Sequence, residues 1–242
     1  IAPNGGGSVN DAEASAGTVT FDSTFYTSFE DAKFEVNPKL KGMYEGYLAD
    51  KTVNGDADID IGHYSLPSIE SSYENYNDAA VIILGNSSKK SGESGHELQY
   101  GEAQKALVDF VTQKFDKVVV LINKSVPMEI DWLKKNDKID AILLLGEAGT
   151  NGLDVTGHLL NGDINPSGRL VDTYVVDQTK VPSYVNYNKQ GIANMMSGND
   201  TYKSYKLGSN ETNTYFVEYE EGIYVGYRYW ETRGYEEDDN WA

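Results

Sequence analysis

Two carboxylates within one glycine-punctuated segment are the residues best suited to catalysis. Glu93 and Glu97 lie in residues 86–97, where neighbouring glycines let the chain reach outward. A carboxyl group that is mobile and partly desolvated can donate a proton to a leaving oxygen. Polar neighbours in the same segment are candidate substrate contacts: Ser91, Ser94 and His96. The alternative is a solvated polar loop whose glutamates do no chemistry, because exposed Glu is common.

Other catalytic chemistries lack their residues. The chain has no cysteine, which excludes disulfides, thiolate catalysis and cysteine-ligated zinc. It also has no G-x-S-x-G elbow, so a serine hydrolase of that kind is unsupported. The three histidines are scattered and none lies in an H-E-x-x-H pattern: His63, His96 and His158. We therefore expect no metal and no cofactor, and we expect His158 to be a packed or half-exposed helix residue.

A glycine-rich stretch, Gly146-x-x-Gly149-x-x-Gly152, follows one apolar run and precedes a helical pattern. A turn of this kind can bind phosphate at the start of a helix. The stretch lacks the G-x-G start of the dinucleotide fingerprint, and no basic residue stands near it. A nucleotide-binding doubly wound domain stays open as a third reading.

The charge of the chain restricts its partners. Its 242 residues include 38 acidic and 20 basic side chains, which gives a net charge of −18. Such a surface repels the phosphates of nucleic acids and anionic membranes, whereas neutral sugars are not repelled. No run of 18 apolar residues occurs, so we expect no membrane insertion by this segment. Cytoplasmic, secreted and cell-surface locations all stay open.

The middle of the chain alternates short apolar runs with helical patterns. The expected strands are residues 79–85, 117–122 and 139–146. The expected helices are residues 101–115, 127–135 and 153–160. This alternation predicts an α/β fold in which a mainly parallel sheet is flanked by helices in three layers. Ligands of such sheets bind beyond the carboxyl ends of the strands, and the segment with Glu93 leaves the first strand at that end.

The flanking regions are less regular, and the prediction is a single domain over residues 1–242. Ser28 is expected to cap a short helix that ends near Phe34, and Pro38 to open a second helix. The alternating residues 215–219 and 223–230 are expected to be strands. The remaining expectations are a flexible lead-in at 1–18, loop at 50–78 with one short helix near 69–76, a long excursion at 171–214 and a frayed tail at 236–242.

Several of these motifs, taken in order, resemble those of one enzyme family. The most specific are Asn165-Pro-Ser-Gly-Arg169 and Glu221-Gly-Ile-Tyr-Val-Gly-Tyr-Arg228. Further matching pieces are Ala79–Gly85, Ser91-Gly-Glu93, Gln104-Lys-Ala-Leu107, Val118–Asn123, Pro127–Trp132 and Gly146–Leu170. Residues 75–232 are therefore similar to the α/β-sandwich domain of glycoside hydrolase family 3, which includes β-glucosidases and β-xylosidases.

The resemblance implies retaining hydrolysis of β-linked sugars. In the family, an aspartate on a TIM barrel is the nucleophile, and a carboxylic acid protonates the leaving oxygen. The Glu of a Ser-Gly-Glu-Gly motif is the acid/base in many members, and the matching residue here is Glu93. Because Ser94 replaces the last Gly and the usual Asp-Arg pair is replaced around His96, Glu97 is the fallback.

The barrel and its nucleophile motif are not found in this sequence, which is expected to be a piece of a larger enzyme. The implied partners are a β-linked sugar and a TIM-barrel domain of the same parent protein, and the domain alone is not expected to complete catalysis. The alternative is a non-catalytic carbohydrate-binding or structural sandwich domain. Neither the sugar nor the linkage follows from these residues.

Overall fold

The computed structural model describes residues 24–54, 59–85, 99–124, 127–146, 148, 151–182, 206–207, 210–211 and 221–234. Contacts group the chain into two compact units, each treated separately below. The first comprises residues 1–90, 100–126 and 132–169, and the second comprises residues 91–99, 127–131 and 170–242. The single domain over residues 1–242 stays a prediction. The expectations for residues 1–18, 215–219 and 236–242 lie outside the described residues.

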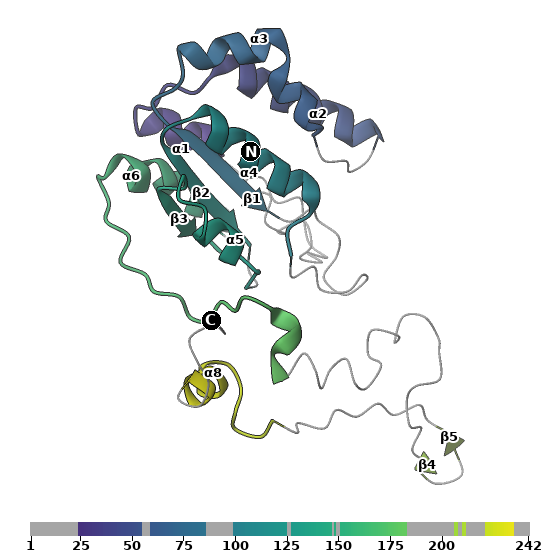
Figure 1. Ribbon diagram of the computed structural model, residues 1–242. Coiled ribbons are helices and arrows are strands. Elements are labelled where there is room, and N and C mark those ends of the chain that lie inside the picture. The colour runs from purple at the N-terminus through teal and green to yellow at the C-terminus, as the bar shows by residue number, and fades with distance from the viewer. Residues whose placement is uncertain are drawn as a thin grey trace. The chain divides into compact units, whose positions relative to one another are not determined.

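A parallel sheet of three strands forms the centre of the first unit (Figure 1). Its order is β1 (Ala80–Gly85), β2 (Val118–Asn123) and β3 (Ala141–Leu144). All three strands were predicted, and their nearly continuous apolar composition fits strands covered on both faces. In the register of the sheet, Gly85 lies beside Asn123, so β1 and β2 end at the same edge.

Alternate residues of the strands face two helical layers. On one face, Ile83 and Leu121 pack in a buried cluster with Phe25 and Phe29 of α1 (Phe25–Asp31). Helix α6 (Thr156–Asn161), which follows η3 (Gly152–Val155), contacts α1 in the same layer. On the other face, the residues of opposite parity are also buried, and α4 (Glu102–Lys114) contacts β1. The predicted α/β sandwich is therefore confirmed.

Helix α1 begins earlier than predicted. Thr24, and not Ser28, caps it: the Thr24 hydroxyl accepts a bond from Thr27 N at 3.1 Å, and Thr24 N donates to Thr27 Oγ1 at 2.8 Å. These reciprocal bonds satisfy two backbone donors at the start of the helix. Ser28 therefore lies inside the helix, and it is buried. Helix α2 (Pro38–Asn54) begins at Pro38 as predicted, because proline is well tolerated at that position.

Short helical turns occupy much of the region before β1, which was predicted to be loop with one short helix near 69–76. They are η1 (Ile61–Ser65), α3 (Pro67–Glu70) and η2 (Ser71–Glu74). After β2, α5 (Asp131–Lys134) is shorter than the predicted helix, and residues 127–130 are not helical. That boundary was wrong because proline permits a helix start without requiring one.

The second unit contains less regular structure in its described residues. They include η4 (Gln178–Lys180), an antiparallel pair of β4 (Lys206–Leu207) with β5 (Asn210–Glu211), and α8 (Tyr227–Gly234). The strand predicted over residues 223–230 is wrong. Gly222 and Gly226 have positive φ values of 57° and 59°, which interrupt an extended run, and Trp230 N then bonds to Gly226 O at 3.3 Å.

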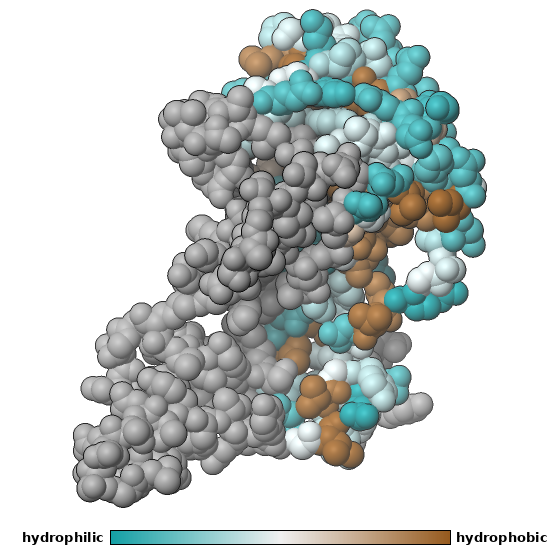
Figure 2. All heavy atoms as spheres, turned by 180° about the vertical axis from the view of Figure 1, so that it is seen from behind, coloured by the Kyte–Doolittle hydropathy of each residue, from teal (hydrophilic) through white to brown (hydrophobic). Residues whose placement is uncertain are grey.

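Hydrophilic residues cover most of the α2–α3 end of the first unit in the view of Figure 2. Ten large apolar side chains are exposed among the described residues, and six of them come from residues 170–171 and 223–227. No helix in the described ranges has the length and apolar character that a membrane crossing requires.

Candidate functional site

The candidate site residues Glu93, Glu97, Ser91, Ser94 and His96 lie outside the described residues. The structure does describe the two chain ends that hold their segment. The segment that contains these residues begins after Gly85, at the carboxyl end of β1, and ends before Gln99, which lies just before α4. The segment therefore starts at the sheet edge where ligands of parallel α/β folds bind.

One side chain joins the two ends of this segment within the first unit. The Gln104 carboxamide accepts a hydrogen bond from Gly101 N at 2.8 Å. Its nitrogen donates to the carbonyl oxygen of Gly85 at 3.3 Å. Because Gln104 lies in the first turn of α4, it fixes the start of that helix against the end of β1. Sequence reasoning noted Gln104 as part of a matching motif but missed this role.

An aromatic pair lies beside the same chain end. Tyr100 is 3% exposed, and its ring packs edge-on against Trp132, with 6.1 Å between the ring centroids. Such pairs add about 0.5–1.5 kcal/mol beyond the area that they bury. The backbone that follows the Glu93 segment is therefore held by packing as well as by Gln104.

Two polar residues at the end of the central strand are buried. Asn123 is 5% exposed and Lys124 is 8% exposed. The Asn123 Oδ1 atom has no hydrogen-bond partner among the described residues. Buried polar groups without partners are uncommon in folded proteins and call for an explanation, such as a bound water, an ion or a catalytic role. The sequence signal was available, since a polar pair directly follows an apolar run, but it was not recognised.

A second polar cluster, in the second unit, centres on Glu129. The Oε2 atom of Glu129 accepts a hydrogen bond from the Gln99 side chain at 2.6 Å. Its Oε1 atom accepts one from Gln178 N at 2.7 Å. Gln99 is the first described residue after the Glu93 segment. Sequence reasoning missed this cluster because its members are separated by 30 and 49 positions.

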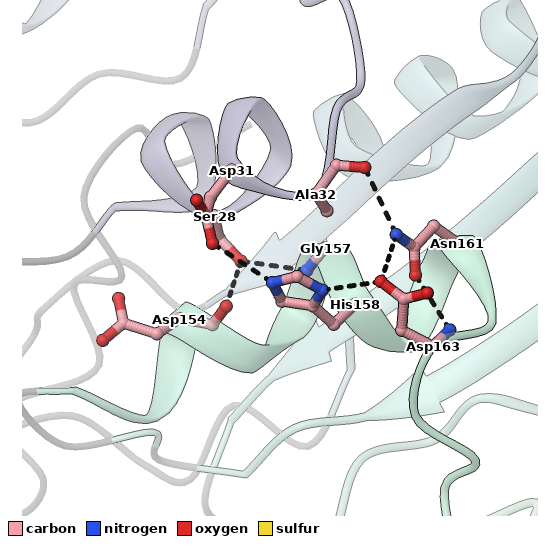
Figure 3. A network of polar contacts seen from close by, with 8 residues as sticks. All are labelled: Ser28, Asp31, Ala32, Asp154, Gly157, His158, Asn161 and Asp163. Atoms are coloured by element: carbon pink, nitrogen blue, oxygen red, sulfur yellow. Dashed lines mark hydrogen bonds and ion pairs between the residues drawn. The ribbon is translucent and has the colours of Figure 1, made fainter.

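A polar network of eight residues lies between α1 and α6 and their adjoining turns in the first unit (Figure 3). The Ser28 hydroxyl donates to Asp154 O and accepts from Gly157 N, both at 2.9 Å. A Cβ atom at Gly157 would lie 2.2 Å from the Ser28 carbonyl oxygen, so only glycine fits there. Asn161 adds a bond to Ala32 O at 3.2 Å.

His158 belongs to this network and faces two carboxylates. Its Nδ1 lies 2.9 Å from Asp163 Oδ2, and its Nε2 lies 3.2 Å from Asp31 Oδ2. The bonds to Asp163 and then to Asp31 raise the pKa of His158, because the imidazolium can donate to both. Bonds from His158 and then Asn161 lower the pKa of Asp163. His158 is a half-exposed helix residue, as predicted.

Asp31 and Asp163 approach different nitrogens of the His158 ring. The three side chains therefore do not converge on one point where a metal ion could bind. Within the described parts of the chain, no three acidic, histidine or cysteine side chains converge as metal ligands. The network at α1 and α6 therefore joins two helices, whereas the groups at the carboxyl edge of the sheet are those that could serve a reaction.

Comparison with known proteins assigns the chain to a family. A model of the glycosyl hydrolase family 3 C-terminal domain matches residues 11–227. The chain therefore belongs to glycoside hydrolase family 3, and it corresponds to the family's C-terminal domain.

The similar proteins include bacterial β-glucosidases. "Beta-glucosidase A" of Butyrivibrio fibrisolvens is 29% identical over 216 residues, which cover 78% of this chain and 23% of that protein. "Thermostable beta-glucosidase B" of Acetivibrio thermocellus is 28% identical over 214 residues, covering 86% and 23% respectively. The chain thus spans less than a quarter of the length of these relatives.

A solved structure has the same fold. The β-glucosidase from Paenibacillus barengoltzii aligns with a TM-score of 0.62 at 24% identity, over 90% of this chain and 22% of that one. At this level of identity the likeness supports the α/β architecture alone.

Proposed function

We propose that this chain supplies the proton-transferring half of a retaining β-glycosidase. The substrates are β-linked glucosides or related sugars, and a barrel domain of the same protein supplies the aspartate nucleophile. Membership of family 3 and similarity to two β-glucosidases support this assignment.

In the proposed mechanism, Glu93 acts as acid and then as base. Its carboxyl proton passes to the glycosidic oxygen while the barrel aspartate attacks the anomeric carbon, which forms a covalent glycosyl-enzyme. The Glu93 carboxylate then takes a proton from water, and the resulting hydroxide displaces the aspartate. A retaining enzyme requires the two carboxyl groups to lie about 5–5.5 Å apart.

The main structural support is the attachment of the Glu93 segment. It leaves β1 at the carboxyl edge of a parallel sheet, and Gln104 bonds to the backbone on both sides of it. An acid/base residue gains from such a fixed base, because an error of about 1 Å in position can lower a rate about a hundredfold. Ser91, Ser94 and His96 are proposed as substrate contacts in the same segment, with Glu97 as the fallback acid.

Substitution of Glu93 in the complete protein, with the chain joined to its barrel, tests the assignment. Glu93→Gln should lower kcat/KM for a phenyl β-glucoside by about 10²- to 10⁴-fold, because this leaving group needs protonation. A 2,4-dinitrophenyl glucoside should lose much less in its first step, since its leaving group departs as an anion. Added azide should restore turnover of the 2,4-dinitrophenyl glucoside by Glu93→Gln, because azide attacks the glycosyl-enzyme without base assistance.

Glu97→Gln is the matched control, because it removes a carboxylate from the same segment. Unchanged turnover in Glu93→Gln would refute the role of Glu93, and a selective loss in Glu97→Gln would transfer that role to Glu97. The isolated chain should not hydrolyse either substrate, because it would lack the proposed nucleophile.

A further inference from the structure

Glu129 joins two stretches of chain that are distant in sequence. One oxygen of its carboxylate accepts from the Gln99 side chain at 2.6 Å, and the other accepts from Gln178 N at 2.7 Å. All three residues belong to the second unit. Both donors point at an acceptor that carries a full negative charge, which makes these bonds stronger than bonds between neutral groups.

The burial of the neighbouring residues differs between Glu129 and its partner Gln99. Met128, the neighbour of Glu129, is 1% exposed, and Val175, three residues before Gln178, is 3% exposed. Gln99 is exposed, so no burial holds its side chain. Glu129 and Gln178 thus lie close in sequence to buried residues, whereas Gln99 is exposed, and we infer that the carboxylate holds Gln99.

Gln99 follows Glu97 by two residues and Glu93 by six. A chain of six residues extends at most about 22 Å, so fixing Gln99 restricts where the Glu93 backbone can lie. Gln104 restricts the same segment independently, through Gly85 and Gly101.

We propose that Glu129 is a positioning residue for the acid/base segment and that it acts by holding Gln99. This inference rests on the proposed function of Glu93. Glu129 is not itself the proton donor, because each of its oxygens already accepts a hydrogen bond from the protein.

A charge exchange between the two side chains tests the contact. Gln99→Glu in the complete protein places one carboxylate against another and should lower kcat for a phenyl β-glucoside about tenfold. Its KM, and its kcat/KM for the 2,4-dinitrophenyl glucoside, should change less than about threefold, because kcat/KM reports the first step and this leaving group departs without a proton. Glu129→Gln alone should stay within about threefold, because the Gln99 carboxamide can turn its oxygen toward the new donor.

The double variant Gln99→Glu with Glu129→Gln restores a donor opposite a carboxylate. It should recover kcat to within about threefold of the natural protein. Gln113→Glu is the matched control, because it makes the same change at another exposed position, on α4, and should leave kcat unchanged.

The outcomes separate this inference from the proposed function. Full activity in Gln99→Glu, or no recovery in the double variant, would overturn the positioning role even if Glu93→Gln is inactive. Full activity in Glu93→Gln would instead remove the proposed function. Because Gln99 is exposed, its substitution should not lower the urea midpoint of unfolding. A lowered midpoint, together with an equal loss of kcat/KM for both substrates, would show that Glu129 makes a structural contact only.

Discussion

Substitution of Gly157 by alanine should destabilise the chain, although the same change stabilises most helices. Gly157 lies in α6 and faces the backbone of α1. An added Cβ atom would lie 2.2 Å from the Ser28 carbonyl oxygen, 2.8 Å from Ser28 C and 2.7 Å from Ala32 Cβ. None of these atoms can turn away as the end of a long side chain could, so the helices themselves must separate.

The geometry sets the size of the effect. Moving the nearest contact from 2.2 Å to 3.0 Å requires a shift of about 0.8 Å between α1 and α6. That shift also stretches the 2.9 Å bond from Gly157 N to the Ser28 hydroxyl, and it loosens the packing of Phe25 and Phe29 on Ile83. Overpacking of this kind costs about 1–3 kcal/mol, and a weakened buried hydrogen bond adds about 1 kcal/mol. Alanine's higher helix propensity offsets about 1 kcal/mol, which leaves a net loss of about 1–3 kcal/mol.

Urea unfolding followed by circular dichroism and tryptophan fluorescence measures this loss. Gly42→Ala is the matched control, because Gly42 lies in α2 and a Cβ there meets nothing within 4 Å. The control should gain about 0.5–1 kcal/mol from helix propensity alone. A Gly157→Ala protein as stable as the natural chain would refute the close approach of α1 to α6.

Two further predictions concern the same helices. The folded-state pKa of His158 is raised, so its contribution to stability is complete below its ordinary value of about 6.5 and is lost as the pH rises through the higher folded value. The stability advantage of the natural chain over His158→Gln, measured as the difference in urea midpoint, should therefore be larger at about pH 5.5 than at about pH 9, and an equal difference at both would contradict it. Thr156 is fully buried, and its hydroxyl has no partner among the described residues, so Thr156→Val should raise the free energy of unfolding by about 1 kcal/mol. A Thr156→Val chain that is less stable by a similar amount would show that the hydroxyl is satisfied, for example by a bound water.

The sheet and its two helical layers were predictable because their signals are local. Each strand is a short apolar run, and α4 has a clear apolar side, so periodicity alone located them. Within the Asn165–Arg169 motif, Arg169 donates to Ser167 O at 3.2 Å and to Gly168 O at 3.0 Å. Turn chemistry of this kind depends only on neighbours in the sequence.

The sequence-based predictions were wrong where contacts between residues distant in sequence determine the local structure. Ser28 has the residue type of a cap, but its hydroxyl serves Asp154 and Gly157, which lie 126 and 129 positions away. Residues 223–230 alternate like a strand, yet the backbone of Gly226 permits a turn into α8, and alternation cannot register this. Glu129 entered the sequence analysis only as part of the Pro127–Trp132 motif, because its two partners are remote in sequence.

The close contact of α1 with α6 also restricts the order of events during synthesis. Helix α1 ends at Asp31, but α6, whose Gly157 contacts Ser28 of α1, is complete only at Asn161. At a translation rate of about 5–20 residues per second, roughly 130 residues take about 7–26 seconds to emerge. During that interval Phe25 and Phe29 have no α6 beside them, so a nascent chain must keep these aromatic rings from associating with other proteins before its own last layer arrives.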